Sequence, residues 1–526
     1  MPLRHIRIAV VVIVVCVVIA ANMSLKDRVV HYVLNRIADD SLEEVERDRL
    51  YAGALAGMTQ TAPDFPYTCW LPPSEQEDYE RELQGQIAGI GLFNLVKDFA
   101  SGEFTFLPIY GTPASEAGLR YGDRIVKVNG EPVDKLTVWE LVGRLRGEEG
   151  TKLSLAIRSR ESQEHEETPL RSVEITRALI QQSIISGDRR NPDGTWNFTL
   201  ENEPDIGYIR ISQFADATVP EFMTAMATLE SLKPAGVILD FRDNPGGFLP
   251  GAIEICEAFL KPGKTIVTTR YRSGSIKRQY TSCQDERFTM PLVILIDEGS
   301  ASAAEIVAAC LQDNVRAQVV GTRSYGKGTI QELFMLPYNM GLLRLTDASF
   351  WRPNGLMLHR KKTSLPTDVW GVSPNDGCDV PITSFQKMLT QLRRDVRTSL
   401  LPEEAALAIK EQNANLAQLR DRMKTATTEQ ECQEILSEYG FPSLQQGMGA
   451  SDEEITRDDP TSRVAIAPES EPGSEPVKEA PLPDLTEKDV PLVSDATWTV
   501  TGAEPWRDPQ LDRAVQVLRK SVGSGQ

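Results

Sequence analysis

The chain is poor in histidine and has no clustered cysteines, and together these features disfavour a metal site. Only four histidines occur in 526 residues, and no two have a ligand-like spacing. The seven cysteines form neither a CxxC pattern nor a dense disulfide framework, although one or two disulfides stay open. We therefore expect no metal and no cofactor. These residues are His5, His31, His165, His359, Cys16, Cys69, Cys256, Cys283, Cys310, Cys378 and Cys432.

An excess of positive charge is also missing. The chain has 56 basic and 75 acidic residues, a formal net charge of −19, whereas a nucleic-acid partner is held by excess Lys and Arg. We therefore expect no nucleic acid and favour a polypeptide substrate. Hydrophobic residues at 41% are near the globular average, and the length exceeds the roughly 250–300 residues at which single cores stop growing. We therefore expect two or more folded domains.

The N-terminus carries an unbroken apolar run of 14 residues from Ile8 to Ala21, preceded by Arg4 and Arg7. This matches a secretory signal, so we expect export to the periplasm or cell envelope. A helix of that length rises only ~21 Å against a bilayer core of ~30 Å. Membrane anchoring through residues 8–23 would need flanking residues or a thinned bilayer, and cleavage after Ala20 or Ala21 stays open. A buried core helix would not explain the basic flank.

A β-rich unit is expected near residues 85–178. Its runs Asp123–Asn129 and Leu153–Arg158 alternate apolar and polar residues, which is typical of half-buried strands. The pair Asn129-Gly130 is a strong hairpin signal.

The pattern then changes to fully apolar strands alternating with helical segments, which predicts an α/β core. The expected strands are Ile206–Ile211, Gly236–Asp240, Pro291–Ile296 and Ala317–Gly321, and the expected helices are Glu221–Leu232, Ala252–Leu260 and Ala303–Gln312.

Helical segments flank these units. Ser24 to about Leu83 should form short packing helices, with Val29, Val30, Tyr32, Val33, Ile37, Leu50, Tyr51 and Leu55 as an apolar stripe. Glu403 to Leu436 reads as helix. Ser451 to Val493, rich in Pro, Glu, Asp and Ser, should be a disordered linker. Pro509–Arg519 has the spacing of an amphipathic helix that docks back.

A candidate nucleophile lies in the segment from Ile296 to Ile306. A buried strand there runs through small residues into a helix, and a helix N-terminus favours a developing oxyanion. Ser300 and Ser302 are the candidates. Both could instead be ordinary helix caps.

A candidate base follows at Lys327, between Gly326 and Gly328. The two glycines allow a tight turn, and burial lowers a lysine pKa by up to ~3–5 units, which makes a neutral, basic amine feasible. Alone, such a lysine would more often be solvated or bind phosphate. A Walker motif is not complete, because Gly328 stands where Ser or Thr is required.

Together these segments resemble the carboxyl-terminal processing peptidases, whose signature is Gly-Ser/Thr-Ala-Ser-Ala-x-Glu followed by Phe/Tyr-Gly-Lys-Gly-x-x-Gln. The resemblance implies Ser302 as nucleophile, Lys327 as base and Gln331 as the residue that orients the lysine. The lysine follows the serine by 25 residues (327 − 302 = 25), as in that family. Ala304 departs from the Ser that many members have. The implied fold is a crotonase/ClpP-like layered α/β protease core with an inserted PDZ-like domain and flanking helices.

The run from Ile238 to Phe248 resembles the family's Asp-Leu-Arg-x-Asn-Pro-Gly-Gly turn. By this resemblance Gly247, with Gly246 as the alternative, and Ala303 supply the oxyanion-hole amides. Read alone, the run would be an ordinary turn after a strand.

Gly89-Ile-Gly-Leu92 and the later run Gly111 to Gly130 resemble a protease-associated PDZ domain. Such domains add an extended C-terminal peptide to a sheet edge. The implied substrate-binding residues are Gly89, Ile90, Gly91 and Leu92.

We therefore predict an exported serine endopeptidase with a Ser–Lys dyad that cleaves polypeptides with exposed C-termini. A non-catalytic PDZ scaffold or chaperone-like binder is the alternative. A Ser-His-Asp site would have to use His359, which we expect at the surface. Oligomeric state is open, and the terminal helices could support a homodimer. The expected parts are a signal peptide or anchor (1–23), a helical region (24–84), the PDZ-like domain (85–178), the peptidase core (179–376), a second helical region (377–445), an acidic linker (446–503) and a docking helix (504–526).

Overall fold

The computed structural model describes residues 25–83, 86–98, 101–160, 170–181, 183–423 and 507–523. The predicted leader and the acidic linker lie outside these ranges. The chain forms two compact units. The first comprises Met1–Gln84, Lys261–Gln284 and Gly326–Gly371, and the second comprises Gly85–Leu260, Asp285–Tyr325 and Val372–Gln526.

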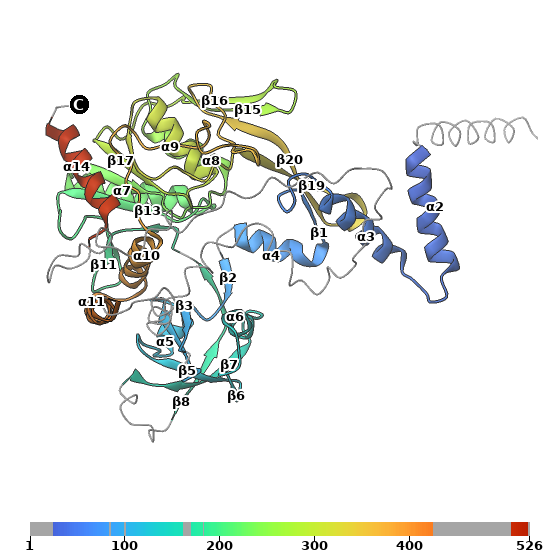
Figure 1. Cartoon of the computed structure of the whole chain (residues 1–526), viewed down its shortest axis with the longest axis horizontal. Coiled ribbons are helices and arrows are strands. Elements are labelled where there is room, and N and C mark those ends of the chain that lie inside the picture. The colour runs from blue at the N-terminus through green and yellow to red at the C-terminus, as the bar shows by residue number, and fades with distance from the viewer. Residues whose placement is uncertain are drawn as a thin grey trace, which may run out of the picture. The chain divides into compact units, whose positions relative to one another are not determined.

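A mostly parallel sheet forms the centre of the second unit (Figure 1). Its strand order is β10-β13-β14-β17-β18, and β13, β14, β17 and β18 run parallel. Every residue of β14 and β17 is buried, as expected for strands covered on both faces. The α/β prediction is confirmed. The strands are β10 (Ile185–Ser186), β13 (Ile206–Ile211), β14 (Gly236–Asp240), β17 (Leu292–Ile296) and β18 (Gln318–Gly321).

Helices α7 (Thr218–Leu232), α8 (Leu249–Ala258) and α9 (Ala303–Asp313) connect these strands. The terminal helix α14 (Pro509–Gly523) packs on the same sheet, and its Ala514, Val517 and Leu518 share one buried cluster with Ile206, Tyr208, Ile238, Val293, Leu295 and Val320. The predicted docking of the C-terminal segment is therefore present.

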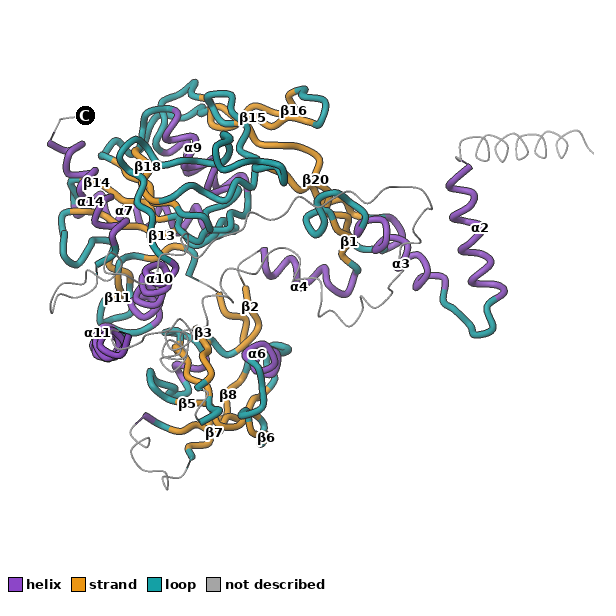
Figure 2. Tube along the Cα trace, viewed as in Figure 1, coloured by secondary structure: helices purple, strands orange, loops and turns teal. Residues whose placement is uncertain are grey.

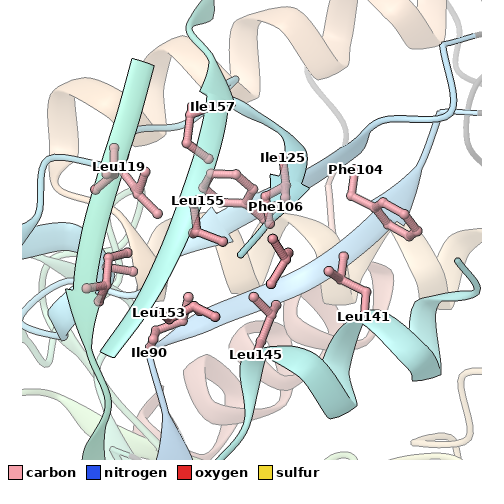
Figure 3. Packing of buried hydrophobic residues seen from close by; sticks show 14 of the residues in the cluster. Ile90, Phe104, Phe106, Leu119, Ile125, Leu141, Leu145, Leu153, Leu155 and Ile157 are labelled. Carbon is pink, nitrogen blue, oxygen red and sulfur yellow. The ribbon is translucent and has the colours of Figure 1, made fainter. Parts of the chain in front are cut away.

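The described residues of the β-rich insert in the second unit form a six-stranded antiparallel sheet with two short helices (Figure 2). Figure 3 shows its core, in which Phe104, Ile125, Leu141 and Leu155 point toward one another. The predicted hairpin is present, because Asn129 (φ 50°) and Gly130 (φ 84°) join β5 to β6. Strands β2 and β9 pair where the chain enters and leaves the insert. Its elements are β2 (Gln86–Gly89), β3 (Leu92–Lys97), β4 (Phe104–Pro108), α5 (Pro113–Glu116), β5 (Arg124–Val128), β6 (Glu131–Pro132), α6 (Val138–Leu145), β7 (Lys152–Arg158), β8 (Arg171–Thr176) and β9 (Ala178–Gln181).

A helical hairpin follows the core. Helix α10 (Ser384–Ser399) begins with a capping box between Thr383 and Gln386, and α11 (Pro402–Met423) follows after two residues. The expected helix from Glu403 is thus confirmed as far as Met423, and its remainder lies outside the described residues. The small hairpin β11 (Arg189–Arg190) and β12 (Trp196–Asn197) completes the unit.

The first unit holds a second, antiparallel sheet with the path β1-β20-β15-β16, in which β19 also pairs with β20. Residues 261–284 and 326–371, which we expected to lie within the peptidase core, contribute most of its strands. Its elements are α2 (Leu25–Asp40), α3 (Arg47–Gln60), β1 (Cys69–Leu71), α4 (Pro73–Leu83), β15 (Thr265–Tyr271), β16 (Ile276–Thr281), β19 (Thr329–Met335), η2 (Pro337–Asn339) and β20 (Leu342–Trp351).

Two expectations for the N-terminal region need correction. The region is not purely helical, because Cys69–Leu71 pairs with Arg344–Leu342 of β20. The apolar stripe of α2 is exposed in the described structure, with Val30 at 61% and Val33 at 47% accessibility. Helical spacing shows which face of a helix is apolar, but it does not show that this chain supplies the partner.

None of the helices within the described ranges is long and apolar enough to span a bilayer.

Candidate active site

A glycine turn after β14 is held by one buried asparagine. Asn244 Nδ2 donates to the carbonyl of Ile211 at 2.8 Å, and Asn244 Oδ1 accepts from the amide of Gly246 at 2.8 Å. The carbonyl of Asn244 also accepts from the amide of Ala301 at 2.8 Å. The Asn244 side chain therefore joins β13 to the glycine turn, and its backbone carbonyl joins both to the loop before α9.

Both glycines of this turn are required by their surroundings. Gly246 has φ 97°, and a Cβ there would lie 2.6 Å from Ser302 Cβ and 2.9 Å from the amide nitrogen of Ala303. A Cβ on Gly247 (φ 135°) would lie 1.9 Å from the carbonyl oxygen of Phe214. The bridge between Phe214 and Gly247 uses the carbonyl of Gly246 and the amide of Phe248, so it leaves the Gly247 amide outside the ladder.

Ser302 begins helix α9 in a strained conformation. Its φ of 54° and ψ of −114° lie in a region that side-chain-bearing residues rarely adopt, and its side chain is half-buried. Its amide donates to Glu305 Oε2 at 2.8 Å. Ala303, the next residue, occupies the first helical position, where an amide has no intrahelical acceptor. The turn thus presents a hydroxyl beside a helix N-terminus.

The hydroxyl of Ser300, the other candidate nucleophile, is used in structural hydrogen bonds. Its side chain is completely buried, its Oγ donates to the carbonyl of Phe241 at 2.8 Å, and the same oxygen accepts from the amide of Asp297 at 2.9 Å. The contrast in burial and bonding favours Ser302 as the reactive hydroxyl.

Glu305 links the serine turn to the next loop. It is fully buried, and its Oε1 accepts from Ser324 Oγ at 2.5 Å while its Oε2 accepts from the Ser302 amide. Ser324 Oγ in turn accepts from the amide of Val372 at 2.8 Å. A buried carboxylate therefore stabilises the strained backbone of Ser302.

A buried ionic network lies at the start of the glycine turn. Arg242 pairs with Asp240 at 2.6 Å, and Tyr208 Oη donates to the same carboxylate at 2.7 Å. Burial alone would raise the pKa of Asp240, but the guanidinium groups of Arg242 and Arg210 hold it well below its usual range. Burial and the neighbouring carboxylate raise the pKa of Tyr208, so its hydroxyl stays protonated.

A second network holds the next residue, Asp243. Its carboxylate accepts from Arg394 of α10 at 2.9 Å and lies 3.2 Å from Lys387 Nζ. Burial opposes ionisation, but these two cations keep the pKa of Asp243 below its ordinary value. Burial and then the nearby Asp243 charge raise the pKa of Asp297, which lies 3.1 Å from Lys387. Helix α10 therefore anchors the loop that carries the glycines.

Lys327 belongs to the first unit, and Ser302 belongs to the second. The glycines beside the lysine are required there, since a Cβ on Gly328 would lie 2.2 Å from the amide nitrogen of His359 and a Cβ on Gly326 would lie 2.7 Å from Arg360 Cβ. Lys327 Nζ lies 4.8 Å from the centroid of the Tyr67 ring. The aromatic face shields one side of the amine, a contact that the sequence did not reveal.

Gln331 lies on β19, and its Nε2 donates to Oγ1 of Thr329 and of Thr346, each at 3.1 Å. His359 is half-buried, which corrects the expectation of a surface residue. Burial lowers its pKa, and its Nδ1 has no hydrogen-bond partner among the described residues.

Comparisons with known proteins show the family of this chain. Residues 205–375 match peptidase family S41, and residues 108–159 match a PDZ domain. Carboxy-terminal processing protease CtpA of Bacillus subtilis is 30% identical over 394 residues, which cover 72% of this chain and 79% of that protein. The carboxyl-terminal-processing protease of Synechocystis is 33% identical over 344 residues, covering 65% and 74%. The chain belongs to the carboxy-terminal processing protease family. It is a serine peptidase that acts on polypeptides, as its motifs predicted.

In this processing protease the predicted peptide-binding loop lies at the start of β3, the edge strand of the insert's sheet. The carbonyls of Ile90 and Gly91 accept from the amides of Ala114 and Ile109 at 2.8 and 3.0 Å. Gly91 has φ 85°, and a Cβ there would overlap Thr112. The Ile90 side chain is buried in the insert's core, so any contact that it makes with a peptide must be through its backbone.

Within the described ranges of the protease, no group of three His, Cys, Asp or Glu side chains could hold a metal ion. Cys69, Cys256, Cys283, Cys310 and Cys378 are free thiols.

Sequence reasoning missed the residues that support the site: Asn244, Glu305, Ser324, Tyr67 and the partners of Asp243. Asn244 and Glu305 stand inside the motifs, where their position was a usable signal. Ser324 directly precedes the second motif, whereas Tyr67 and the partners of Asp243 lie far from the motifs in sequence.

Proposed function

We propose that this processing protease cleaves its substrates with a Ser302–Lys327 dyad. The main support for this proposal is the geometry of Ser302. Its hydroxyl is half-buried on a strained helix N-cap, and Gly246 packs against this residue. Strain of this kind persists when the surrounding contacts hold it, and it is concentrated at functional sites.

In the proposed mechanism, the neutral amine of Lys327 takes the proton of Ser302 Oγ as that oxygen attacks the scissile carbonyl carbon. The amides of Gly247 and Ala303 stabilise the resulting oxyanion, and Gly246 is the alternative donor. The C–N bond then breaks and the leaving amine takes the proton, which leaves an acyl-enzyme ester. Lys327 next removes a proton from water, whose oxygen attacks the ester carbonyl carbon. The bond between that carbon and Ser302 Oγ then breaks, Lys327 returns the proton to Oγ, and the product leaves with a new C-terminal carboxyl group. Gln331 is proposed to orient the lysine, by likeness to the family.

The PDZ domain is proposed to capture the exposed C-terminus of a substrate. The edge strand β3 can accept an added strand, and the backbone from Gly89 to Leu92 lies at its start. The bound chain would then reach the peptidase core. The proposed layering of that core is of the crotonase/ClpP-like kind, which its buried parallel sheet and covering helices support.

Replacing Lys327 with Ala tests the dyad. We expect no measurable cleavage of an unfolded peptide with an apolar C-terminus, and binding of that peptide should be unchanged. Lys361→Ala is the matched control, since Lys361 is an exposed lysine of the same unit. Unchanged cleavage by Lys327→Ala would exclude the dyad. A Ser302→Ala variant that still cleaves would favour the alternative, a PDZ scaffold or chaperone-like binder carrying a contaminating activity.

We also propose export to the periplasm or cell envelope, where residues 8–23 would anchor the protein if they are not cleaved. The basic flank and apolar run support this proposal. Mass spectrometry of the mature N-terminus, together with cell fractionation, tests it. An intact Met1 in a cytosolic fraction would contradict it.

A homodimer is proposed through the exposed stripe of α2, whose Val30, Val33 and Ile37 share one helical face. Val33→Glu should then convert a dimer to a monomer in sedimentation equilibrium. A wild-type monomer at micromolar concentration would refute the proposal.

A further inference from the structure

The segment that leads into the terminal helix contacts the residue just before the catalytic glycine turn. Asp508 Oδ2 accepts from Arg242 Nη1 at 2.7 Å, and Gln510 Oε1 accepts from the same nitrogen at 3.3 Å. Arg242 and Gln510 are buried, with exposed fractions of 3% and 0%. These contacts join positions that are 266 and 268 residues apart.

Helix α14 is docked in one register by contacts along its whole length. At its start, Gln510 Nε2 donates to the carbonyl of Val380 at 3.1 Å. Near its end, Leu518 packs so closely on the sheet that a Cβ on Gly236 would lie 2.7 Å from Leu518 Cδ1. Arg519 also pairs with Glu203 and Asp205, but these pairs are exposed and add little to the docking. Asp508 therefore reaches Arg242 from a fixed helix.

Asp508 is one of the carboxylates that compensate the positive charge around Arg242. Arg242 shares the Asp240 carboxylate with Arg210, whose Nη1 lies 3.9 Å from Asp240 Oδ1 and donates to the carbonyl of Arg242 at 2.7 Å. Arg394 faces the same site and pairs with Asp243. Asp240, Asp243 and Asp508 are thus the carboxylates that pair directly with Arg242 and Arg394, and Asp508 is the one that the C-terminal segment brings.

The consequence for catalysis follows from chain connectivity. Arg242 is followed directly by Asp243 and Asn244, and Asn244 holds the Gly246 amide at 2.8 Å. A shift of Arg242 would be transmitted through two residues to the backbone that packs on Ser302. Loss of the Asp508 charge would favour such a shift, because a buried charge without a partner is strongly unfavourable.

We infer that Asp508 is a positioning residue for the glycine turn, and that α14 is a required part of the active site. The inference rests on the proposed role of that turn in binding the oxyanion. By this inference α14 contributes to catalysis, whereas its apolar face alone would indicate only that it stabilises the fold.

The test is a kinetic comparison of full-length variants on the unfolded peptide with an apolar C-terminus. Asp508→Asn keeps the shape but removes the charge, and kcat should fall about tenfold to a hundredfold with KM within twofold. Asp508→Glu should recover much of the loss. Arg519→Gln is the matched control, because it removes an exposed ion pair of the same helix far from Arg242, and its kcat should be unchanged.

Thermal unfolding accompanies the kinetics and separates positioning from general docking. If Asp508→Asn keeps a wild-type kcat, the inference is wrong. It is also wrong if Arg519→Gln lowers kcat to the same degree. Should Asp508→Asn fail to fold, Gln510→Met removes the neutral acceptor of Arg242 together with the donor to the Val380 carbonyl, and its kcat should fall several-fold. An unchanged kcat in Gln510→Met overturns the inference. Ser302→Ala, assayed in parallel, tests the proposed function itself, because residual cleavage by this variant would refute the dyad. An inactive Ser302→Ala together with a fully active Asp508→Asn would refute only the positioning role of Asp508.

Discussion

Gly246→Ala is the substitution for which the structure predicts the sharpest effect. The new Cβ would meet Ser302 Cβ at 2.6 Å, the carbonyl oxygen of Ala301 at 2.7 Å and the Ala303 nitrogen at 2.9 Å. Ordinary contacts of this kind begin near 3.4 Å. The backbone of the serine turn or of the glycine turn must therefore move by roughly half an ångström or more.

The size of the effect follows from two contributions. An alanine at φ 97° costs on the order of 1–3 kcal/mol in backbone strain, and the forced shift adds to it, so unfolding free energy should fall by about 2–4 kcal/mol. Loss of one oxyanion donor alone costs about 10²–10³ in kcat, and misplacement of the nucleophile by an ångström has an effect of about 10². We expect kcat to fall by at least about a hundredfold.

Peptide cleavage under saturating substrate, together with a thermal melt, measures both effects. Gly274→Ala is the control, because Gly274 also has a positive φ, 84°, but no atom lies within 4 Å of the added Cβ. It should lose about 1–2 kcal/mol of stability and keep full activity. A Gly246→Ala enzyme with normal kcat would refute the assigned packing of the two turns.

Two further predictions concern residues around the site. Ser300→Ala leaves the Asp297 amide without the Ser300 acceptor and removes one of two donors to the Phe241 carbonyl, so the unfolding free energy should fall by about 1–3 kcal/mol while cleavage persists. A stable but inactive variant would contradict the structural role of Ser300. Burial raises the pKa of Asp395 to about 6, above its unfolded value of 3.8, so the folded protein binds an extra proton between those values and loses stability as pH rises through them. Asp395→Asn should therefore raise the melting temperature at pH 7.5, by an amount equivalent to about 1–3 kcal/mol, and leave it unchanged near pH 3.5; equal shifts at both pH values would count against the raised pKa.

The α/β core could be predicted because its strands are buried on both faces. Ile206–Ile211 and Gly236–Asp240 were anticipated with their observed bounds, and the start of α9 at Ala303 follows from the turn of small residues before it. The hairpin at Asn129-Gly130 is a local signal of the same kind, since positive φ at both positions favours these residues.

The remaining features depend on pairs that no local pattern records. Strand β1 has only three residues, Cys69–Leu71, too few for an alternating pattern, and its pairing with β20 spans more than two hundred and seventy residues. The contact between Arg242 and Asp508 is equally remote in sequence. The exposed face of α2 shows a different limit, since amphipathic spacing does not reveal what covers the apolar side.

The motif residues were easier to identify than the residues that hold them. Ser302 and Lys327 stand in recognisable turns, whereas Lys387 and Arg394, which anchor Asp243, lie on a helix with an ordinary charged face. Supporting residues of this kind can be recognised only from their position in the folded structure, and a single sequence does not carry that information.

Trapping of the acyl-enzyme tests the central claim most directly. The protease would be acid-quenched during turnover of an activated ester of a short peptide, digested, and examined by mass spectrometry. The account predicts one acyl group on Ser302 in the wild type, none in Ser302→Ala, and no accumulation within the same time in Lys327→Ala. An acyl group on a different residue, or wild-type acylation kinetics in Lys327→Ala, would contradict it.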